Sequence, residues 1–555
     1  MVTESHWLSF ITFLPLLGVP ALLCLRSEDH TWIRRVALVV SLVEFVVSLF
    51  LLPGFRLGQA DYQFVEYANW IGNAIHYHIG IDGLSLFLVL LTTFLTPLAI
   101  LCSWNSIHEN VKGFFIAILV IETAMIGVFV SLDLFLFFVF WELTLIPMYF
   151  MIGIWGHDRR IYAAVKFILY TMFGSILMLV AILWLYNLSN VHGTGTFDLP
   201  LLQAQLQHGI ISLPPTTELL LFCAFFLAFA IKVPLFPFHT WLPDAHTEAP
   251  TAGSVILAGV MLKLGTYGIM RFCLPLFPYA AHRLAHIIGV LALIGIIYGA
   301  LVATIQPNFK RLIAYTSVSH LGFVILGIFS FTTISFQGAI FQMISHGVST
   351  GGLFLGLGMI YDRRHTYEIK EFGGLANPMP IIMSFYLFIA LSSLALPPLN
   401  GFIGEFLILI GVFQFHHFWA AFASSGAVLS AIYLLWSYQR VALGEVTVEK
   451  NRTLSDASGR ERLILVTIAV AILFMGLASP LFTRRMEATT DNLARQTQIE
   501  GAPQDAKAPS RIVLPIGPEL PAAAGTDVSA GNSLAPAAPT HAHLVTAGTE
   551  AQVNP

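Results

Sequence analysis

Residues 219–236, LLLFCAFFLAFAIKVPLF, and residues 251–270, TAGSVILAGVMLKLGTYGIM, decide the fold of this chain. Each stretch is apolar and long enough to cross a bilayer, yet each carries a lysine near the expected membrane midplane, Lys232 or Lys263. A charged side chain at the bilayer centre costs about 2.5–3.5 kcal/mol on insertion scales, and such residues usually face a bundle interior or a wet cavity. The two lysines therefore predict a membrane protein that conducts protons or other ions.

The composition extends this prediction to the whole chain. Of 555 residues, 57% are hydrophobic and 10% are charged, which excludes an ordinary soluble enzyme. The net charge of −4 provides no basic field for nucleic acid. The four cysteines form no C-x-x-C pair, and no glycine-rich nucleotide fingerprint is present, so we expect no metal, iron–sulfur, flavin or nicotinamide site on this chain.

Apolar runs predict an all-α polytopic membrane protein with about fourteen transmembrane helices. The expected starts lie near Trp7, Ile33, Leu84, Gly113, Phe135, Tyr162, Leu219, Thr251, Leu284, Leu312, Thr333, Pro380, Phe418 and Leu463. We expect longer loops at residues 53–78 and 187–215. The segment 484–555 lacks aromatic residues and is rich in Ala, Pro, Thr and Gln, which predicts a disordered tail.

The distribution of Lys and Arg predicts the orientation. Most of these residues outside the tail, such as Arg34, Arg159 and Lys310, lie in loops that follow odd-numbered predicted spans. Because basic loops stay in the cytoplasm, both termini are expected outside it. We therefore expect a multi-pass protein of a bacterial inner (cell) membrane.

Proline interrupts the seventh and the twelfth predicted spans, at residues 232–237 (KVPLFP) and 396–401 (LPPLNG). Proline removes an amide donor, and backbone groups freed at membrane depth must face protein or water. An odd number of spans relates the two breaks, so the equivalent units run in opposite directions. This pattern is typical of inverted repeats with functional sites at the ends of half-helices.

Six ionisable residues inside predicted spans are the candidate proton path. In chain order they are Glu142, Lys232, Lys263, His320, His346 and Glu405. A buried lysine with a switchable carboxylate partner can alternate between charged and neutral forms, and histidine titrates near neutral pH. Joined by water at the broken helices, these groups would form a relay in which protons continue past His320 and His346 to Glu405; the order of the transfer steps does not follow from the sequence.

Several of these positions also have a purely structural interpretation. Lys166 lies near the start of its span and could extend its ammonium group to the membrane surface. We interpret Glu44 as a structural residue or as one that faces lipid near a neighbouring subunit. For Glu122, the sequence favours a structural role and a role in proton transfer equally. A single histidine on an apolar face is usually a satisfied core residue, so His320 and His346 are candidates only because of their place between the lysines and Glu405.

Five stretches resemble the antiporter-like membrane subunits of respiratory complex I, NADH:quinone oxidoreductase. They are WELTLIPMYF (141–150), AAVKFILYTMFGS (163–175), the long segment from KVPLFPFHTW to MLKLGTYG (232–268), KRLIAYTSVSHLGF (310–323) and SLALPPLNGFIGEF (393–406). The resemblance implies fourteen helices with two inverted five-helix repeats, each containing a proline-broken helix. It implies three N-terminal helices in 1–110, repeats in 111–280 and 281–445, a last helix in 446–483 and the tail 484–555.

The resemblance also implies roles for individual residues. Glu142 and Lys232 match the coupled acid–base pair of the family, Lys263 the central lysine, His320 and His346 polar links, and Glu405 the terminal proton site. Lys166 and Asp133 match recurring positions and, with Glu122, are assigned supporting roles. Sister subunits and sodium/proton antiporters typically have lysine where this chain has Glu405, which favours the subunit M (chain 4) branch. Asn308, near which the family usually has an aspartate, and the long tail depart from the pattern.

The implied function is proton translocation driven by quinone reduction elsewhere in a hetero-oligomeric complex. FMN, iron–sulfur clusters, NADH and quinone are expected on partner subunits, and no cofactor on this chain. The implied partners are other membrane-arm subunits, including the two sister antiporter-like subunits, and lipids. Three alternatives stay open: a subunit of a multisubunit sodium/proton antiporter or membrane-bound hydrogenase, a stand-alone solute transporter, and a non-conducting scaffold subunit.

Overall fold

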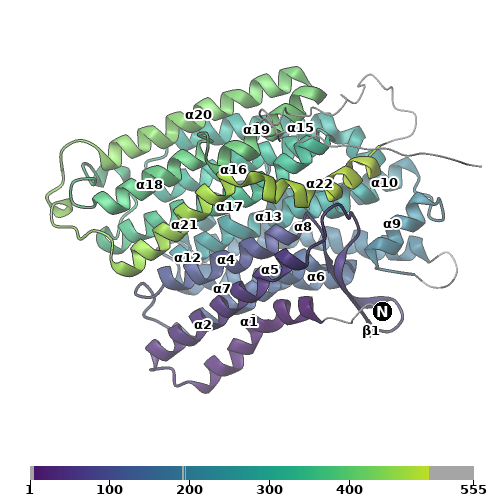
Figure 1. Cartoon of the computed structure of the whole chain (residues 1–555), viewed down its shortest axis with the longest axis horizontal. Helices are drawn as coiled ribbons and strands as arrows, with labels where there is room; N and C mark the ends of the chain where they lie inside the picture. The colour runs from purple at the N-terminus through teal and green to yellow at the C-terminus, as the bar shows by residue number, and fades with distance from the viewer. Residues whose placement is uncertain (1–5, 191–192, 194, 499–555) are drawn as a thin grey trace, which may run out of the picture. The chain divides into compact units, whose positions relative to one another are not determined.

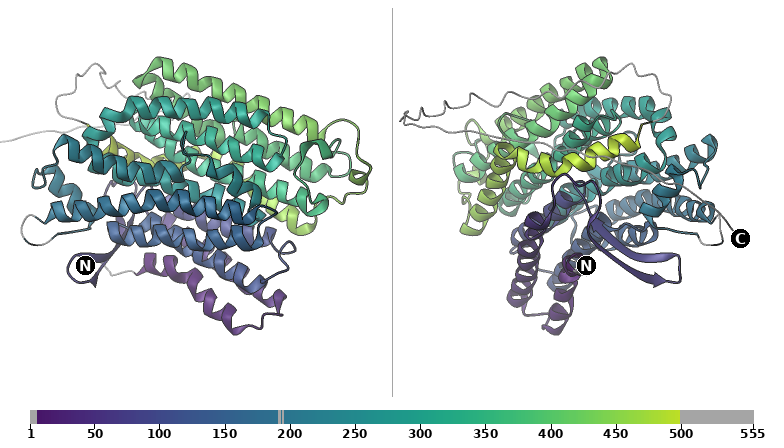
Figure 2. Two further views of the ribbon diagram at one scale, coloured as in Figure 1. Left: turned by 180° about the vertical axis from the view of Figure 1, so that it is seen from behind. Right: turned by 45° about the vertical axis from the view of Figure 1, so that its right-hand side comes forward.

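The computed structural model describes residues 6–190, 193 and 195–498. Within these residues long helices lie side by side, as Figures 1 and 2 show. Eleven helices in the described part of the chain are long and apolar enough to cross a membrane, or twelve if the bent pair α21 and α22 is counted as one span. The prediction of a helical, polytopic membrane protein is therefore confirmed, whereas the number fourteen stays a prediction.

The N-terminal region contains a β-hairpin that the sequence analysis assigned to a loop. Its elements are α1 (Trp7–Cys24), α2 (His30–Leu49), α3 (Leu51–Gly54), β1 (Gln63–Ile71), β2 (Ile75–Ile81) and α4 (Leu86–Cys102). The strands pair antiparallel, with Tyr67 opposite His78, and the turn begins at Gly72, whose φ of +60° favours glycine. Apolar side chains alternate along β2, IHYHIGI, which is a strand signal in a short segment. The all-α expectation is corrected to this extent.

The middle of the chain contains the first predicted break. Its elements are α5 (Val111–Val130), α6 (Leu134–Leu143), α7 (Leu145–Trp155), α8 (Arg160–Ser189), α9 (Leu199–Gln207), α10 (Pro215–Lys232), α11 (Trp241–Glu248), α12 (Thr251–Ile256), η1 (Leu257–Met261), α13 (Leu262–Gly268), η2 (Ile269–Cys273) and α14 (Leu274–Leu276). The break at residues 232–237 is confirmed, because α10 ends at Lys232 and α11 begins at Trp241. Two π-helical segments, η1 and η2, interrupt the lysine-bearing stretch and were not predicted.

The last third contains the second break. Its elements are α15 (Pro278–Thr304), α16 (Phe309–Ile328), α17 (Thr333–Arg364), η3 (Ile369–Glu371), α18 (Pro380–Ser393), α19 (Asn400–Phe415), α20 (His417–Ala442), η4 (Glu449–Asn451), α21 (Gly459–Leu477) and α22 (Ser479–Gln496). The break predicted at residues 396–401 is confirmed, because α18 ends at Ser393 and α19 begins at Asn400.

Helix α22 corrects the start of the predicted disordered tail. It continues to Gln496 at an angle of 64° to α21, so the prediction is wrong for residues 484–496. Phe482, Met486 and Leu493 recur at helical spacing on its buried face, and the Phe482 ring lies 4.8 Å from that of Phe87. The lack of aromatic residues after Phe482 therefore did not indicate disorder here, because Met486 and Leu493 are enough to form the buried face of the helix. The remainder of the predicted tail, 499–555, lies outside the described residues.

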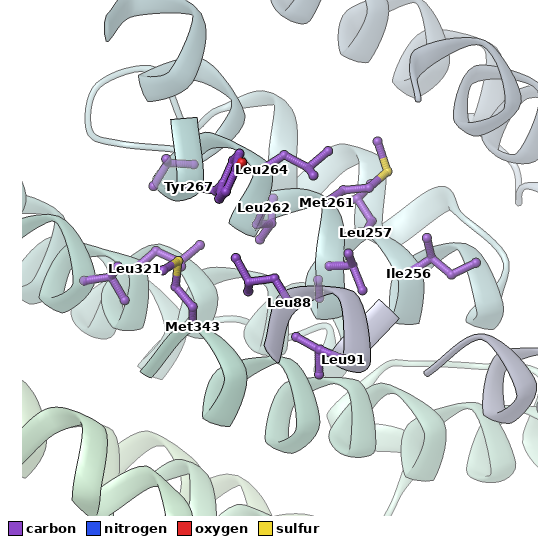
Figure 3. Packing of buried hydrophobic residues seen from close by; sticks show 14 of the residues in the cluster. Leu88, Leu91, Ile256, Leu257, Met261, Leu262, Leu264, Tyr267, Leu321 and Met343 are labelled. Atoms are coloured by element: carbon purple, nitrogen blue, oxygen red, sulfur yellow. The ribbon is translucent and has the colours of Figure 1, made fainter. Parts of the chain in front are cut away.

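The most deeply buried helices are those that carry Lys263 and His346. Every residue of the most apolar windows of 251–276 and of α17 is buried within the chain. Figure 3 shows the packing around them, with Leu88 and Leu91 of α4, Leu262 and Leu264 of α13, Leu321 of α16 and Met343 of α17. Lys263 therefore lies in an apolar core built by several helices, not at a lipid-facing surface.

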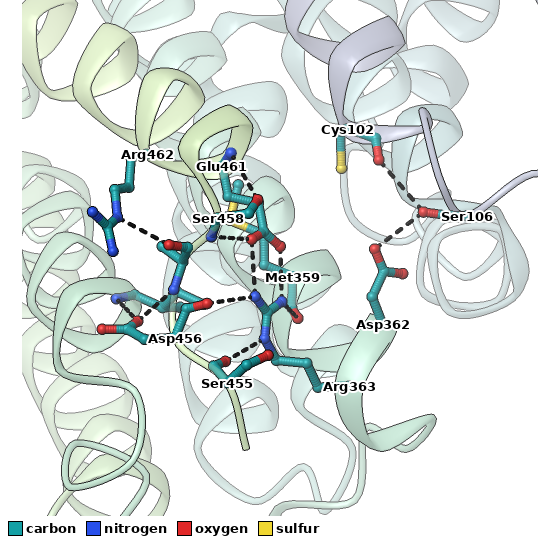
Figure 4. A network of polar contacts seen from close by, with 12 residues as sticks. Cys102, Ser106, Met359, Asp362, Arg363, Ser455, Asp456, Ser458, Glu461 and Arg462 are labelled. Atoms are coloured by element: carbon teal, nitrogen blue, oxygen red, sulfur yellow. Dashed lines mark hydrogen bonds and ion pairs between the residues drawn. The ribbon is translucent and has the colours of Figure 1, made fainter. Parts of the chain in front are cut away.

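A polar network joins the ends of α17 and α21, as Figure 4 shows. The Arg363 guanidinium donates to both carboxylate oxygens of Glu461, at 2.7 and 2.8 Å. It also donates to the carbonyl oxygens of Met359, Ser455 and Asp456. This bidentate pair holds the beginning of α21 against the end of α17.

We expect Arg363→Gln to lower the free energy of unfolding by about 2 kcal/mol, because it leaves the buried Glu461 carboxylate without its charged partner. Arg364→Gln is the matched control, since Arg364 makes one ion contact of 3.8 Å with Glu371 and should lose less than about 1 kcal/mol. The fraction of folded chain that survives heating in detergent, followed by size-exclusion chromatography, measures both. Equal losses in the two variants would contradict this role of Arg363.

Candidate functional site

Four of the six candidate residues form a continuous row across four helices. Lys263 Nζ of α13 lies 2.8 Å from His346 Nδ1 of α17, and the rings of His346 and His320 lie 5.8 Å apart between centroids. His320 Nδ1 of α16 lies 2.9 Å from Glu405 Oε1 of α19. All four side chains are almost fully buried. The sequence left the order of the two histidines open, and helix packing places His346 beside the lysine and His320 beside the glutamate.

Local backbone features bring Lys263 to His346. The π-helical segment η1 directly precedes α13, and the Lys263 ammonium group also donates to the carbonyl oxygen of Ala258. Gly347 allows α17 to approach η1 closely, since a Cβ at this position would lie 2.7 Å from the carbonyl oxygen of Gly259. The close approach of these two backbones places the ammonium group within hydrogen-bonding reach of the imidazole.

Glu405 and His320 have additional partners that the sequence analysis missed. Gln342 Nε2 donates to Glu405 Oε1 at 3.0 Å, and His320 Nε2 lies 3.2 Å from the Tyr433 hydroxyl and 3.4 Å from the Ser393 hydroxyl. Gln342 precedes His346 by one helical turn and therefore shares its face of α17, which was an available signal. Tyr433 and Ser393 come from α20 and α18, and no sequence spacing relates them to His320.

Lys232 lies at the end of α10 and is not in an ion pair with Glu142, the other member of the acid–base pair that the resemblance implies. Its side chain is 1% exposed, its Nζ donates to the Thr144 hydroxyl at 3.2 Å, and it lies 5.1 Å from the centroid of the Trp141 ring. In the described part of the chain no contact within 4.0 Å joins Lys232 to Glu142. One buried oxygen of Glu142 has no hydrogen-bond partner among these residues. Trp141 and Thr144, which flank Glu142 in sequence, are the neighbours of the lysine.

Lys232 is likewise separate from Lys263. Helices α10 and α13 pack so closely that there is no room for a side chain at Gly265. A Cβ there would lie 2.6 Å from the carbonyl oxygen of Phe229. No hydrogen bond between described residues connects the two ammonium groups. The candidate path therefore consists of a connected second half, from Lys263 to Glu405, and a first half whose members are not in contact.

Two of the supporting residues have structural roles in this arrangement. Lys166 Nζ lies 2.7 Å from Asp244, and Arg311 contacts the other oxygen of that carboxylate at 3.2 Å. Lys166 therefore joins α8 to α11 and α16, and its interpretation as a residue extending to the membrane surface stays a prediction. Asp133 caps α6 by accepting from the amides of Phe135 and Leu136, which gives it a structural role.

Glu44 and Glu122 are both 0% exposed, on α2 and α5 respectively. Both carboxylate oxygens of each side chain lack a hydrogen-bond partner among the described residues. The lipid-facing interpretation of Glu44 is wrong, because helix packing within this chain covers it. Neither residue contacts the row from Lys263 to Glu405 through a hydrogen bond in the described residues.

A polar cavity of about 480 Å³ lies beside the Arg363 network, and its lining includes His157, Tyr361 and Asp362. The Tyr361 hydroxyl lies 3.2 Å from His157 Nδ1. His157 is in the connection between α7 and α8, outside the long helices. Burial, and secondarily the charge of Lys310, lowers the pKa of His157 from 6.5 to about 4. This imidazole is therefore neutral at pH 7.

The lowered pKa of His157 predicts a pH dependence of stability. Between pH 6.5 and about 4 the unfolded chain binds a proton at this imidazole and the folded chain does not, so stability falls as the pH decreases through this range. We expect His157→Gln to lose less stability than the unchanged chain over this range and to match its pH dependence above pH 7. Thermal unfolding followed across pH 4–8 measures this, and an unchanged acid slope would contradict the assignment.

Comparisons with known proteins cover almost all of the described helices. Residues 131–430 match the family described as NADH:quinone oxidoreductase/Mrp antiporter, TM, and residues 10–129 match NADH-ubiquinone oxidoreductase chain 4, amino terminus. NADH-quinone oxidoreductase subunit M of Rhodobacter capsulatus is 47% identical over 86% of this chain and 94% of its own. NADH-ubiquinone oxidoreductase chain 4 of Marchantia polymorpha is 42% identical over 89% of this chain and 98% of its own.

Solved structures agree with these sequence relatives. A chain of respiratory complex I from Thermus thermophilus with bound NADH superposes with a TM-score of 0.80 at 31% identity, over 89% of this chain and 100% of that chain. A chain of the Mrp complex from Dietzia has a TM-score of 0.75 at 20% identity, over 89% of this chain and 98% of that chain. The second likeness concerns the fold alone.

Proposed function

This chain belongs to the NADH-quinone oxidoreductase subunit M (chain 4) family, and from that premise we propose that it translocates protons through a Glu–Lys–Lys–His–His–Glu relay. It acts within an enzyme complex, as a hetero-oligomer with other membrane-arm subunits. The relay residues are Glu142, Lys232, Lys263, His346, His320 and Glu405. Quinone reduction elsewhere in the complex provides the driving force.

The observation that carries this proposal is the buried row from Lys263 to Glu405. Its acid, two imidazoles and ammonium group come from four helices, and adjacent members are close enough for a direct or single-water proton transfer. A purely structural role would not require four titratable groups in a row, since well-packed apolar side chains cost less free energy to bury than charged groups. Gln342 and Tyr433 orient the two ends of the His320–Glu405 pair.

In the proposed cycle a change in the charge state near Glu142 controls the proton on Lys232. When the carboxylate approaches, it stabilises the charged ammonium group, and when it retreats, the lysine releases its proton. The lack of an ion pair between Glu142 and Lys232 among the described residues supports a retreated arrangement as one state of this cycle. Water at the break after Lys232 would carry the proton to Lys263, from which it passes to His346, His320 and Glu405.

The proposed membrane topology has fourteen crossings in two inverted five-helix repeats, with both termini outside the cytoplasm of a bacterial cell. The shorter apolar helices α4, α18 and α19 supply the crossings beyond the long helices, with α18 and α19 as the two parts of one broken span. The two confirmed breaks support the repeats, and the positions of Lys and Arg support the orientation.

We further propose that this chain binds no redox group and that FMN, iron–sulfur clusters, NADH and quinone lie on partner subunits. Proton transport is preferred over sodium transport because the relatives with high identity are quinone oxidoreductase subunits, and because Glu405 stands where the antiporters have lysine.

Loss of either member of the Glu142–Lys232 pair should uncouple the relay from quinone chemistry. We expect Glu142→Gln and Lys232→Met each to lower proton pumping and coupled quinone reduction by about tenfold or more while the complex still assembles. Glu449→Gln and Lys450→Met, at exposed positions of η4, are the matched controls. Pumping is measured by a pH-sensitive dye in vesicles, and normal turnover in both relay variants would refute the scheme.

Loss of Lys263 distinguishes a conducting subunit from a scaffold. Lys263→Met keeps the length of the side chain and removes the proton, so pumping should fall about tenfold or more. His346→Phe keeps a ring between Lys263 and His320, and it should show the same loss. If both variants assemble and pump fully, this chain is a scaffold, and the proton path lies elsewhere in the complex.

A further inference from the structure

An apolar groove of about 320 Å³ lies outside the relay and has no part in the proposed function. Helices α2, α3, α4, α17, α21 and α22 line it, with Phe45, Phe94, Val348 and Phe474 among its walls. Its lining on α4 extends from Phe87 to Phe94, so the groove follows that helix for about 10 Å. The groove therefore extends along helices that cross the membrane.

One charged residue, Arg485 of α22, lines this groove among the residues that the structure describes. Its Nη1 donates to the carbonyl oxygen of Leu481 at 2.8 Å, and its buried Nε has no hydrogen-bond partner within the described chain. The remaining guanidinium donors are free for an anionic group. Helix α22 bends away from α21 by 64°, and Arg485 lies in the half of α22 that follows the bend. The lining residues of α21 lie near the end of that helix, just before the bend.

We propose that this groove binds one membrane phospholipid, with an acyl chain between α2, α4 and α21 and the phosphate at Arg485. An apolar groove in the membrane-spanning part of a protein is filled by the hydrocarbon that surrounds it. A guanidinium at its end matches the phosphate of an amphiphile, because Arg binds phosphate oxygens through paired N–H donors. A wholly apolar ligand or the apolar face of a helix would leave that charge without a partner.

The site has a direct connection to the core of the protein. Val348 and Ile344, which line the groove on α17, flank His346 by two residues on either side. The bound acyl chain would pack against the helix that carries one member of the relay. The binding site itself stands on the groove and Arg485, so it holds whether or not the proposed relay operates.

Photo-crosslinking of the intact complex tests the proposal without any substitution. The complex is placed in nanodiscs that contain phosphatidylglycerol with a diazirine in one acyl chain, and labelled peptides are identified by mass spectrometry. We expect labels on the peptides of Phe94, Val348 and Phe474. Diacylglycerol with the same diazirine lacks the phosphate and should label these peptides about fivefold less, the factor expected for one lipid-facing cation.

Substitutions then separate the two parts of the site. Arg485→Gln should reduce phosphatidylglycerol labelling about fivefold, whereas Arg484→Gln, the exposed neighbour on the same helix, should leave it unchanged. Ala471→Trp fills the groove and should abolish labelling at Phe94 and Val348. Equal labelling by both probes, equal effects of the two arginine variants, or crosslinks from these peptides to a neighbouring subunit in place of lipid would each overturn the proposal.

Discussion

The rest of the structure depends on how the ammonium group of Lys263 is buried. Its side chain has no exposure, so its favourable interactions come from groups inside the helix bundle. The carbonyl oxygen of Ala258 and the imidazole of His346 supply those interactions, and both depend on the π-helical segment η1 and on the close approach of Gly347 to Gly259. A charge at this depth is expensive without polar partners, so these two contacts determine what the burial of the lysine costs.

The two broken helices divide the path into parts of different character. Beyond the second break, Glu405 is held by His320 and Gln342, and the row back to Lys263 is continuous. At the first break, Lys232 contacts Thr144 and the ring of Trp141 and is not paired with Glu142. In the proposed relay, a row that is connected at one end and open at the other would hinder the return of protons, which a permanently connected row would allow.

Charges away from the path serve to hold helices together. Asp244 is shared between Lys166 and Arg311, and the Arg363–Glu461 pair joins α17 to α21. Arg363 and Glu461 lie at the ends of their helices, and Lys166, Asp244 and Arg311 are only partly buried, which lowers the cost of the latter group. Helix α17 therefore takes part in three arrangements. Arg363 anchors its end to α21, His346 belongs to the row from Lys263 to Glu405, and Ile344 and Val348 line the groove that contains Arg485.

The class of the protein, the two breaks and the presence of six ionisable residues inside the spans could be read from the sequence, because hydropathy, proline and mid-span charge are properties of short segments. The hairpin at β1 and β2 and the helix that continues past Phe482 were also readable, from alternation in IHYHIGI and from the spacing of Met486 and Leu493, but those signals are weaker than that of a span. Only the tertiary structure decided that His346 precedes His320 in the row and that Tyr433 joins it. Only the structure, likewise, separates Lys232 from Glu142 and encloses Glu44. Each of these depends on which faces of distant helices meet, and no local pattern encodes that.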